Sequence, residues 1–362
     1  MPNNKIRLIS RFFSSISPFI LAFGFSSILL YVGGVSPLFA FRNIIIGALA
    51  GYENIISTLI MLTPLLFTGL AQAFAFRVGI WNIGGEGQFY IGGLFSAFAA
   101  LFLDLPFFLL MSIVIISGFI GGSIWAFIAG ILKVKLGVNE LISTLLLNFV
   151  GFQLVRYFVH FPLRDPEAFN PVTEFFPKSA IPPSLIPGTR LHIGFAIAVV
   201  LTFSLIGFLI KKTTFGYKAQ MVGDSPKTAT FAGINVSKTI IFIMLLSGGV
   251  AGLGGAIETS AVWGYLFEGI SDNYGYIGIG VALVAMEYGK ASILSLIFSS
   301  LLFAVLLSGG RSLHVSGVSL YLITAIQGLV VVCILLQPTI SKILSERING
   351  TDQNVLEGKR LN

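Results

Sequence analysis

The sequence predicts an all-α polytopic membrane protein, with about ten transmembrane helices in two inverted five-helix units. Apolar residues make up 55% of the 362 positions and charged residues only 10%, and the mean hydropathy is +0.93. A soluble domain carries about a quarter of its residues as Asp, Glu, Lys and Arg, so this chain has too few charges to cover a surface in water. Its basic residues lie in short clusters between apolar runs, and not along one polar face as in proteins that bind nucleic acid. A soluble enzyme and a nucleic-acid-binding protein are therefore excluded, and a lipid bilayer is the expected surrounding.

Ten apolar runs are candidates for helices that cross the bilayer, which takes roughly 17 to 25 residues each. They are Ile16–Gly34, Ile55–Phe76, Gln88–Leu103, Pro106–Leu132, Val138–His160, Leu191–Ile210, Thr239–Glu258, Tyr274–Glu287, Ala291–Ser308 and Leu320–Gln337. The third and eighth runs are short and rich in glycine. Basic residues precede the first run but no small-residue cleavage site follows it, so we expect a retained helix.

Basic residues predict the orientation of these helices. With ten spans and a cytoplasmic start, sixteen of the 22 Lys and Arg fall in segments on the cytoplasmic side, as the positive-inside rule requires. We therefore expect one transmembrane domain over residues 1–362 with both termini in the cytoplasm. Its expected parts are a cytoplasmic N-terminus (1–15), an external proline-rich loop (161–190), a cytoplasmic loop (211–238) and a cytoplasmic tail (338–362).

The two longest loops differ in character. The external loop contains seven prolines, which stiffen it and prevent a spanning helix; it either docks an external partner or serves only as a rigid connection. The cytoplasmic loop carries the helix-start signal Asp224-Ser225-Pro226 and a stop at Gly233. We therefore expect a short helix of about two turns at the cytoplasmic face.

Small residues recur every four positions in two of the runs. In the fourth they are Gly118, Gly122, Ala126 and Gly130, and in the seventh Gly248, Gly252 and Ala256. Such stripes allow helix backbones to approach closely where lipid supplies no hydrophobic drive for association. They predict a tightly packed bundle.

The stretch from Gly79 to Gln88 places polar residues and four glycines at the start of the third run. Glycine at this density weakens a helix, and irregular backbone at membrane depth is tolerated only inside protein or beside an aqueous cavity. We therefore expect a broken helix here. Asn82, Glu86 and Gln88 either bind a polar substrate or, in the case of Glu86, cap the N-terminus of the helix.

A partial repeat of this stretch occurs 191 positions later. Asn82-x-Gly84-x-x-Gly87 opens the third run, and Asn273-x-Gly275-x-x-Gly278 opens the eighth. In the predicted topology these two runs point in opposite directions. Inverted repeats place a translocation path at their interface, near discontinuous helices.

Signals for catalysis, metals and cofactors are missing from the sequence. Gly289-Lys290 is followed by Ala291, so no phosphate-binding loop is formed. The three histidines are far apart in the sequence and the single Cys333 lies in an apolar run, so neither a metal site nor a disulfide is expected. We expect no catalytic residue and no cofactor in this chain.

Three ordered blocks resemble the permease subunits of ABC importers that serve branched-chain amino acids, simple sugars and nucleosides. The first is Gly79–Gln88 with Ile91-Gly92-Gly93, and its Asn-Ile-Gly-x-Glu-Gly-Gln form is most similar to the nucleoside and simple-sugar branch. The second is Gly223–Asn235, similar to the family's coupling segment, followed by the glycine-rich run Ser247–Ala256. The third is Gly275–Leu283. Together they cover the chain from about Thr63 to Gln337.

The resemblance implies a fold like that of type II ABC importers, in the cytoplasmic (inner) membrane of a bacterium. A second permease subunit, identical or a paralogue, would complete the channel. Two ABC ATPase subunits would bind ATP and Mg, and an external substrate-binding protein or lipoprotein would deliver the substrate. The residues expected to couple this chain to the ATPase are Gly223, Asp224, Ser225, Pro226, Lys227, Ala229 and Gly233.

A nucleoside or nucleobase is the expected substrate. Aromatic rings offer stacking faces and amides offer hydrogen bonds, so the expected path residues are Trp81, Asn82, Glu86, Gln88, Phe89, Trp263, Asn273 and Tyr276. A simple sugar or a branched-chain amino acid is the alternative within the same family. An ion-coupled secondary transporter and a polytopic transferase are alternatives from other classes.

Overall fold

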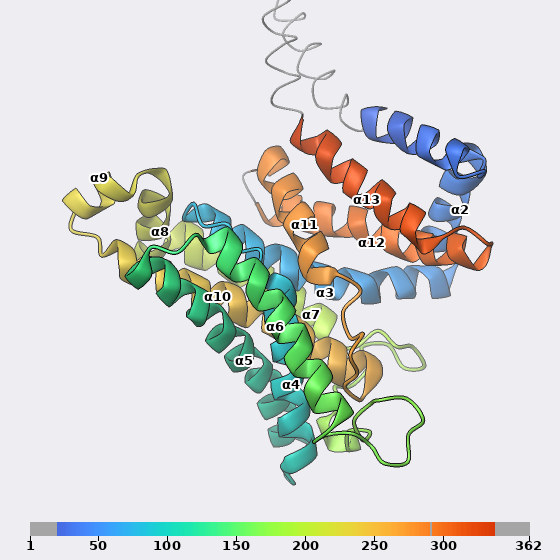
Figure 1. Ribbon diagram of the computed structural model, residues 1–362, viewed down its shortest axis with the longest axis horizontal. Coiled ribbons are helices and arrows are strands. Elements are labelled where there is room, and N and C mark those ends of the chain that lie inside the picture. Colours follow the sequence, from blue (N-terminus) through green and yellow to red (C-terminus); the bar gives the residue numbers. More distant parts are fainter. Residues whose placement is uncertain (1–19, 290–291, 337–362) are drawn as a thin grey trace, which may run out of the picture. The chain divides into compact units, whose positions relative to one another are not determined.

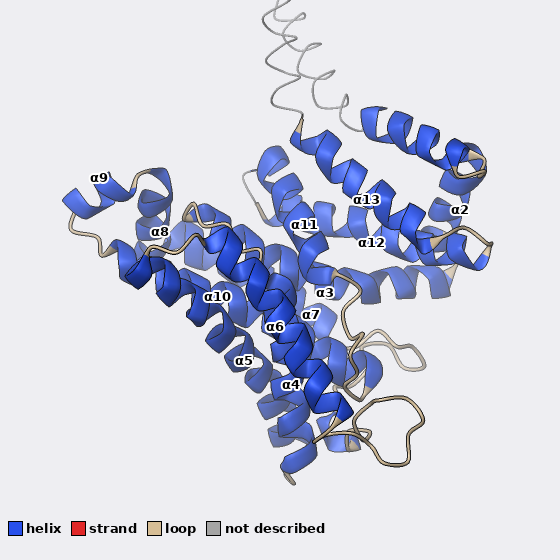
Figure 2. Ribbon diagram, in the orientation of Figure 1, coloured by secondary structure: helices blue, strands red, loops and turns tan. Residues whose placement is uncertain are grey.

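The computed structural model describes residues 20–289 and 292–336, and it is helical nearly throughout (Figures 1 and 2). An unlabelled first helix spans Ile20–Val32. The others are α2 Pro37–Leu49, α3 Tyr52–Arg77, α4 Gly85–Phe102, α5 Phe107–Leu136, α6 Glu140–His160, α7 Gly194–Thr202, α8 Thr214–Asp224, α9 Pro226–Phe231, α10 Val236–Ile257, α11 Tyr274–Gly289, α12 Ile293–Val315 and α13 Leu320–Leu335. The helices α7 and α10 continue as π-helix over Phe203–Ile210 and Glu258–Trp263. β-Pairing within the described ranges is limited to isolated bridges.

Each of the ten apolar runs coincides with a helix, and the all-helical fold is confirmed. The helix α2 was not anticipated, because Arg42 and Asn43 interrupt its apolar residues. Within residues 20–289 and 292–336, five helices can cross a membrane by length and composition, or up to seven if each of two bent pairs counts as one span. The chain is thus a multi-pass membrane protein, whereas the count of ten spans and the two inverted five-helix units stay predictions.

The chain divides into two compact units, residues 49–308 and the segments on either side of them. In the smaller unit, α2 packs against the end of α12, since a Cβ added at Gly309 would collide with the backbone of Ile44. One transmembrane domain over 1–362 remains a prediction. The expected cytoplasmic segments 1–15 and 338–362 lie outside the described residues.

The core of the larger unit is built on the small-residue stripes. Gly118 and Gly122 of α5 face Gly248 and Gly252 of α10, and a Cβ at any of these four glycines would collide with a backbone atom of the opposite helix or with a side chain on it. Gly92 of α4 packs against Gly252 in the same way. The prediction of close helix packing through these stripes is confirmed, and α4, α5 and α10 form the closely packed centre of this unit.

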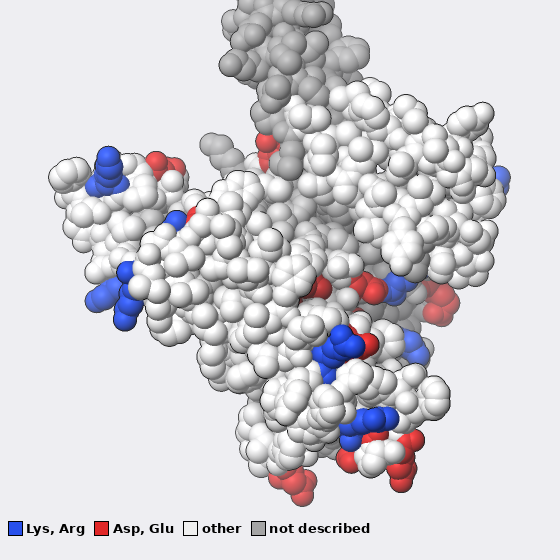
Figure 3. Space-filling view, in the orientation of Figure 1, with Lys and Arg blue, Asp and Glu red and all other residues white. Residues whose placement is uncertain are grey.

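Charged side chains are sparse over the helices of the larger unit (Figure 3). Basic side chains lie over α9, with an acidic group beside them, and below it near the start of α10, whereas the loops at the far end of α5 and α6 carry both signs. The segment 211–238 contains five Lys and one Asp, but the proline-rich segment 161–190 contains three basic and three acidic residues. In the proline-rich segment, the helical structure is limited to the single turn Lys178–Ala180, as the prolines predict.

Candidate functional site

The loop between α3 and α4 is organised by the side chain of Asn82. The helix α3 ends at Arg77, Gly79 adopts a φ of 70°, and α4 begins at Gly85 and runs without interruption to Phe102, so the glycine-rich stretch forms a loop between two helices and the first turn of the second. Asn82 Nδ2 donates to Gln88 Oε1 at 3.1 Å and to Ser247 Oγ of α10 at 2.8 Å. Asn82 Oδ1 accepts from Gln88 Nε2 and from the N–H of Gly84, both at 3.0 Å. All four hydrogen bonds are buried, so they fix the loop to α4 and α10.

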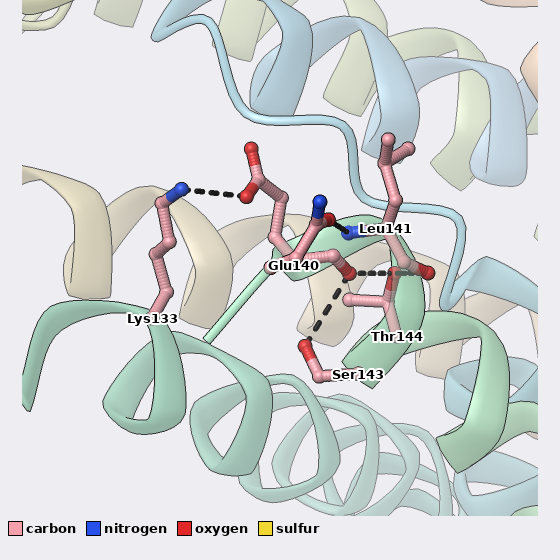
Figure 4. A network of polar contacts seen from close by, with 6 residues as sticks. Lys133, Glu140, Leu141, Ser143 and Thr144 are labelled. Atoms are coloured by element: carbon pink, nitrogen blue, oxygen red, sulfur yellow. Dashed lines mark hydrogen bonds and ion pairs between the residues drawn. The ribbon is translucent and has the colours of Figure 1, made fainter. Parts of the chain in front are cut away.

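The helix α6 holds the same loop from the other side. Asn148 Oδ1 accepts from the N–H of Gly87 at 2.8 Å, and Asn148 Nδ2 donates to the Ile83 carbonyl at 2.8 Å. Thr144 Oγ1 accepts from the N–H of Ile83 at 3.2 Å. Figure 4 shows how the start of α6 is set: Lys133 of α5 lies 2.6 Å from the Glu140 carboxylate, and the Thr144 hydroxyl donates to the Glu140 carbonyl. These hydrogen bonds offset the free energy that burial of an unbonded backbone N–H or carbonyl would cost.

Glu86 joins this loop to a helix that is distant in the sequence. Its Oε2 accepts from the N–H of Gly275, in the first turn of α11, at 2.7 Å. A carboxylate at this position satisfies an unbonded N–H and the positive end of the helix dipole. Glu86 therefore bonds to the start of a helix that the sequence did not indicate, α11. It also lies in the first turn of α4, where the helix dipole favours a carboxylate, as one of the two interpretations expected; the N-cap of α4 is Gly84, with no side-chain hydrogen bond.

The two repeated glycine motifs meet at this point. A Cβ on Gly275 would collide with the backbone of Glu86, and a Cβ on Gly278 would collide with Thr68 of α3. The Thr68 hydroxyl donates to the Tyr274 carbonyl at 2.9 Å. The starts of α4 and α11 thus lie in direct backbone contact, and they need glycine because any side chain would separate them.

The remaining expected path residues are distributed differently. Phe89 is buried on α4 with its ring centroid 5.8 Å from that of Tyr274, and Tyr276 is half-buried on α11. Trp81, Trp263 and Asn273 are exposed. Trp81 packs against Phe76, whereas Trp263 lies in an aromatic cluster with Tyr265 and Phe267. The structure therefore gathers Asn82, Glu86, Gln88 and Phe89, and leaves the three exposed side chains outside that cluster.

Sequence reasoning missed five polar residues that take part in the cluster. They are Thr68 and Gln72 of α3, Thr144 and Asn148 of α6, and Ser247 of α10, and all five are buried. Ser247 also donates to the Ala71 carbonyl at 2.7 Å. These five residues could have been found from the sequence because each is a polar residue inside an apolar run. A polar side chain at membrane depth faces protein or water and not lipid.

The expected coupling segment folds as the sequence indicated. The Ser225 hydroxyl accepts from the N–H of Thr228 at 3.3 Å, Pro226 occupies the first turn of α9, and Gly233 adopts a φ of 76° just beyond it. Lys227 is exposed and Ala229 is buried. Phe231, at the end of α9, is 92% exposed. The short helix is confirmed, and it presents an aromatic ring that this chain does not cover.

The helix α8 links this segment to the loop that carries Asn82. A Cβ on Gly223 would collide with the Arg77 carbonyl at the end of α3. A cavity of about 290 Å³ lies beside this contact and is lined by Phe76, Arg77, Ile210, Gly216, Ala219, Gln220, Gly223, Asp224 and Met286. The end of α8 therefore lies in backbone contact with the end of α3, seven positions before Gly84.

The chemistry available in this cluster is hydrogen bonding and packing. Over the residues with described positions, no group of three or more His, Cys, Asp or Glu is placed to hold a metal ion. The polar groups come from amides, hydroxyls and one carboxylate, which suits recognition of a polar solute.

Comparison with known proteins identifies relatives over most of the chain. Residues 54–335 match the family profile described as branched-chain amino acid transport system, permease component. The nucleoside ABC transporter permease NupB of Lactococcus lactis is 30% identical, over 87% of this chain and 87% of its own length. The glucose ABC transporter permease TsgB13 of Haloferax volcanii is 31% identical, over 83% of each chain. The guanosine ABC transporter permease NupP of Bacillus subtilis is 29% identical, over 77% of this chain and 81% of its own length.

Proposed function

The chain belongs to the branched-chain amino acid transport system permease family, and because two of its relatives are named for nucleoside and guanosine, we propose that it imports nucleosides or nucleobases with energy from separate ATPase subunits. It is an ABC permease, related to transporter subunits and not to enzymes. Under the proposal it lies in a bacterial cytoplasmic membrane with both termini inside. A second permease subunit, two ATPase subunits that bind ATP and Mg, and an external substrate-binding protein complete the transporter.

The hydrogen bond between Glu86 and Gly275 is the observation that carries the proposed mechanism. It joins the starts of two glycine-rich helices, α4 and α11, and substrate paths in transporters lie where such helix starts face each other. The packing is reciprocal, because α3 contacts the start of α11 through Thr68 and α10 contacts the α4 loop through Ser247. This exchange supports two inverted units with the path at their interface.

The coupling step follows from the contacts of α8 and α9. In the proposal, closure of the ATPase dimer moves α9, and the contact between Gly223 and the Arg77 carbonyl passes this movement to the loop of Asn82 and Glu86. Alternating movement of that loop opens one side of the path at a time. Ala229→Pro would disrupt α9 and should abolish uptake and substrate-stimulated ATP hydrolysis, with membrane insertion intact.

Phe231 allows docking to be tested without unfolding α9. Because its ring is 92% exposed, Phe231→Ala should leave the permease folded but weaken its association with the ATPase by tenfold or more, as removal of an exposed aromatic anchor does in other interfaces. Co-purification and ATP-driven uptake measure this effect. Phe169→Ala is the matched control, since Phe169 is 96% exposed but lies in the proline-rich loop. Equal loss in both variants, or loss in neither, would contradict docking at α9.

The substrate is tested by uptake of labelled guanosine, adenosine, ribose, glucose and leucine in a strain that lacks the gene. Two of the relatives above are named for nucleoside or guanosine, so we expect guanosine and adenosine uptake to be lost. Loss of ribose or glucose uptake alone would favour the sugar alternative, which the relative named for glucose supports. Loss of leucine uptake alone would refute the nucleoside proposal, and uptake that persists without any ATPase partner would favour an ion-coupled transporter.

A further inference from the structure

One side chain at the meeting point of α3, α4 and α11 has no assigned role. Gln72 lies on α3, one helical turn after Thr68, and is fully buried. Its Nε2 faces the first residue of α4 so closely that a Cβ on Gly85 would collide with it, and the Gly275 carbonyl oxygen would lie 3.6 Å from the same Cβ. We call this place the junction, defined by Gln72, Gly85, Glu86 and Gly275.

Gln72 differs from the other polar residues around it. Neither Oε1 nor Nε2 of Gln72 has a hydrogen-bond partner. In contrast, Asn82, Gln88 and Asn148 each have their amides bonded, and Glu86 is bonded to Gly275. Buried amides in folded proteins are almost always hydrogen bonded, and an exception calls for a functional or structural reason.

The position of Gln72 suggests that reason. The starts of α4 and α11 touch at the junction through glycines, and the proposed movement of the loop of Asn82 and Glu86 would separate them. Their separation would uncover the amide of Gln72 between two helix N-termini, and a passing solute would then be its nearest partner.

We propose that Gln72 binds the substrate during its passage, through a donor and an acceptor on its amide. This inference rests on the proposed function and names a residue of the path. An amide offers one acceptor oxygen and two donor hydrogens without a net charge. It therefore suits a neutral solute that presents adjacent donor and acceptor groups, such as the ribose hydroxyls or the base edge of a nucleoside.

Gln72→Leu tests this in the assembled transporter with its binding protein, in membrane vesicles. Leu has a similar volume and removes both polar atoms, so the variant should unfold at the same temperature as the wild type or higher. Maximal guanosine uptake should fall tenfold or more. The KM should stay unchanged, because the binding protein delivers the substrate before Gln72 meets it. Wild-type maximal uptake in Gln72→Leu would overturn the inference.

Ser300→Ala is the matched control. The Ser300 hydroxyl of α12 is likewise fully buried and without a partner, but it is not part of the junction. Uptake and thermal stability should both stay at the wild-type level in this variant. An equal fall in uptake would show a general effect of altering buried polar groups, and the role of Gln72 would be rejected.

Thiol labelling gives a measurement that does not depend on the uptake rate. In a Cys333→Ala background, which removes the single native cysteine, Gln72→Cys should be unreactive at rest. It should react with a small permeant thiol reagent at least tenfold faster when ATP and substrate are supplied. Equal reactivity in both conditions would contradict opening of the junction. If the wild type takes up ribose, glucose or leucine and not guanosine, the proposed substrate fails, and Gln72→Leu is then measured on the solute that is transported.

Discussion

At the scale of single residues, the Asn82 amide shows what residue type alone can indicate. The amide and carboxylate side chains of Asn82, Glu86 and Gln88 stand out in an apolar chain, and all three are buried in the structure. The distant partners of Asn82 and Glu86, however, come from α10 and α11, up to 189 positions away in the case of Gly275. A polar residue in an apolar run shows that a partner must exist, but not which one.

The Asn82 network leads to a stability prediction. Asn82→Leu removes the partners of the Gln88 amide and the Gly84 N–H and leaves Ser247 with its bond to Ala71, and each buried group left unpaired costs about 1–3 kcal/mol. We expect a lower thermal unfolding temperature in detergent. Asn170→Leu, at an exposed position of the proline-rich loop, should unfold as the wild type does. Equal unfolding temperatures for Asn82→Leu and the wild type would show that the network does not stabilise the fold.

At the scale of elements, short sequence patterns predicted a helix correctly where neighbouring residues alone determine its ends. The Ser225-Pro226 start and the Gly233 stop specify α9 because capping depends on neighbours only a few positions away. The extra helix α2 and the π-helical ends of α7 and α10 were missed. A π-helix shifts hydrogen bonds by one residue and leaves no clear mark in hydrophobic periodicity.

The glycine stripes lead to a packing prediction. A Cβ on Gly122 would collide with the Gly248 carbonyl, whereas a Cβ on Gly328 of α13 would meet no atom within 4 Å. Gly122→Ala should therefore push α5 away from α10, at a cost of about 1–3 kcal/mol. Gly328→Ala should be tolerated. Size-exclusion profiles and thermal unfolding of both variants measure this, and an unchanged Gly122→Ala protein would contradict the contact.

At the scale of the whole molecule, the charge distribution predicts the orientation in the membrane. Segment 211–238 carries five Lys and one Asp, whereas 161–190 carries equal numbers of basic and acidic residues. The positive-inside rule places the first in the cytoplasm and the second outside. Opposite sides for the two segments require that the run between them, Leu191–Ile210, crosses the membrane.

Labelling of single cysteines checks this orientation. In a Cys333→Ala background, Phe169→Cys should react with a membrane-impermeant maleimide in intact cells, and Lys227→Cys only after the membrane is opened. Both positions are exposed, so access across the membrane decides the result. The reverse pattern would show that the predicted topology is inverted, and labelling of both in intact cells would show that both segments lie outside.

The sequence by itself determined that this protein is all-helical and multi-pass, with a capped α9 and close-packed glycine stripes. These features follow from composition, periodicity and capping, which depend on residue type and short spacing, whereas the ABC permease family was indicated by the resemblance of three motif blocks. Only the tertiary structure decided that Glu86 bonds to the start of α11, that Trp81, Trp263 and Asn273 lie outside the polar cluster, and that Gln72 lies at the junction. The reason is physical: which helix start meets which depends on packing between segments nearly 200 positions apart, and no local pattern in the chain specifies that contact.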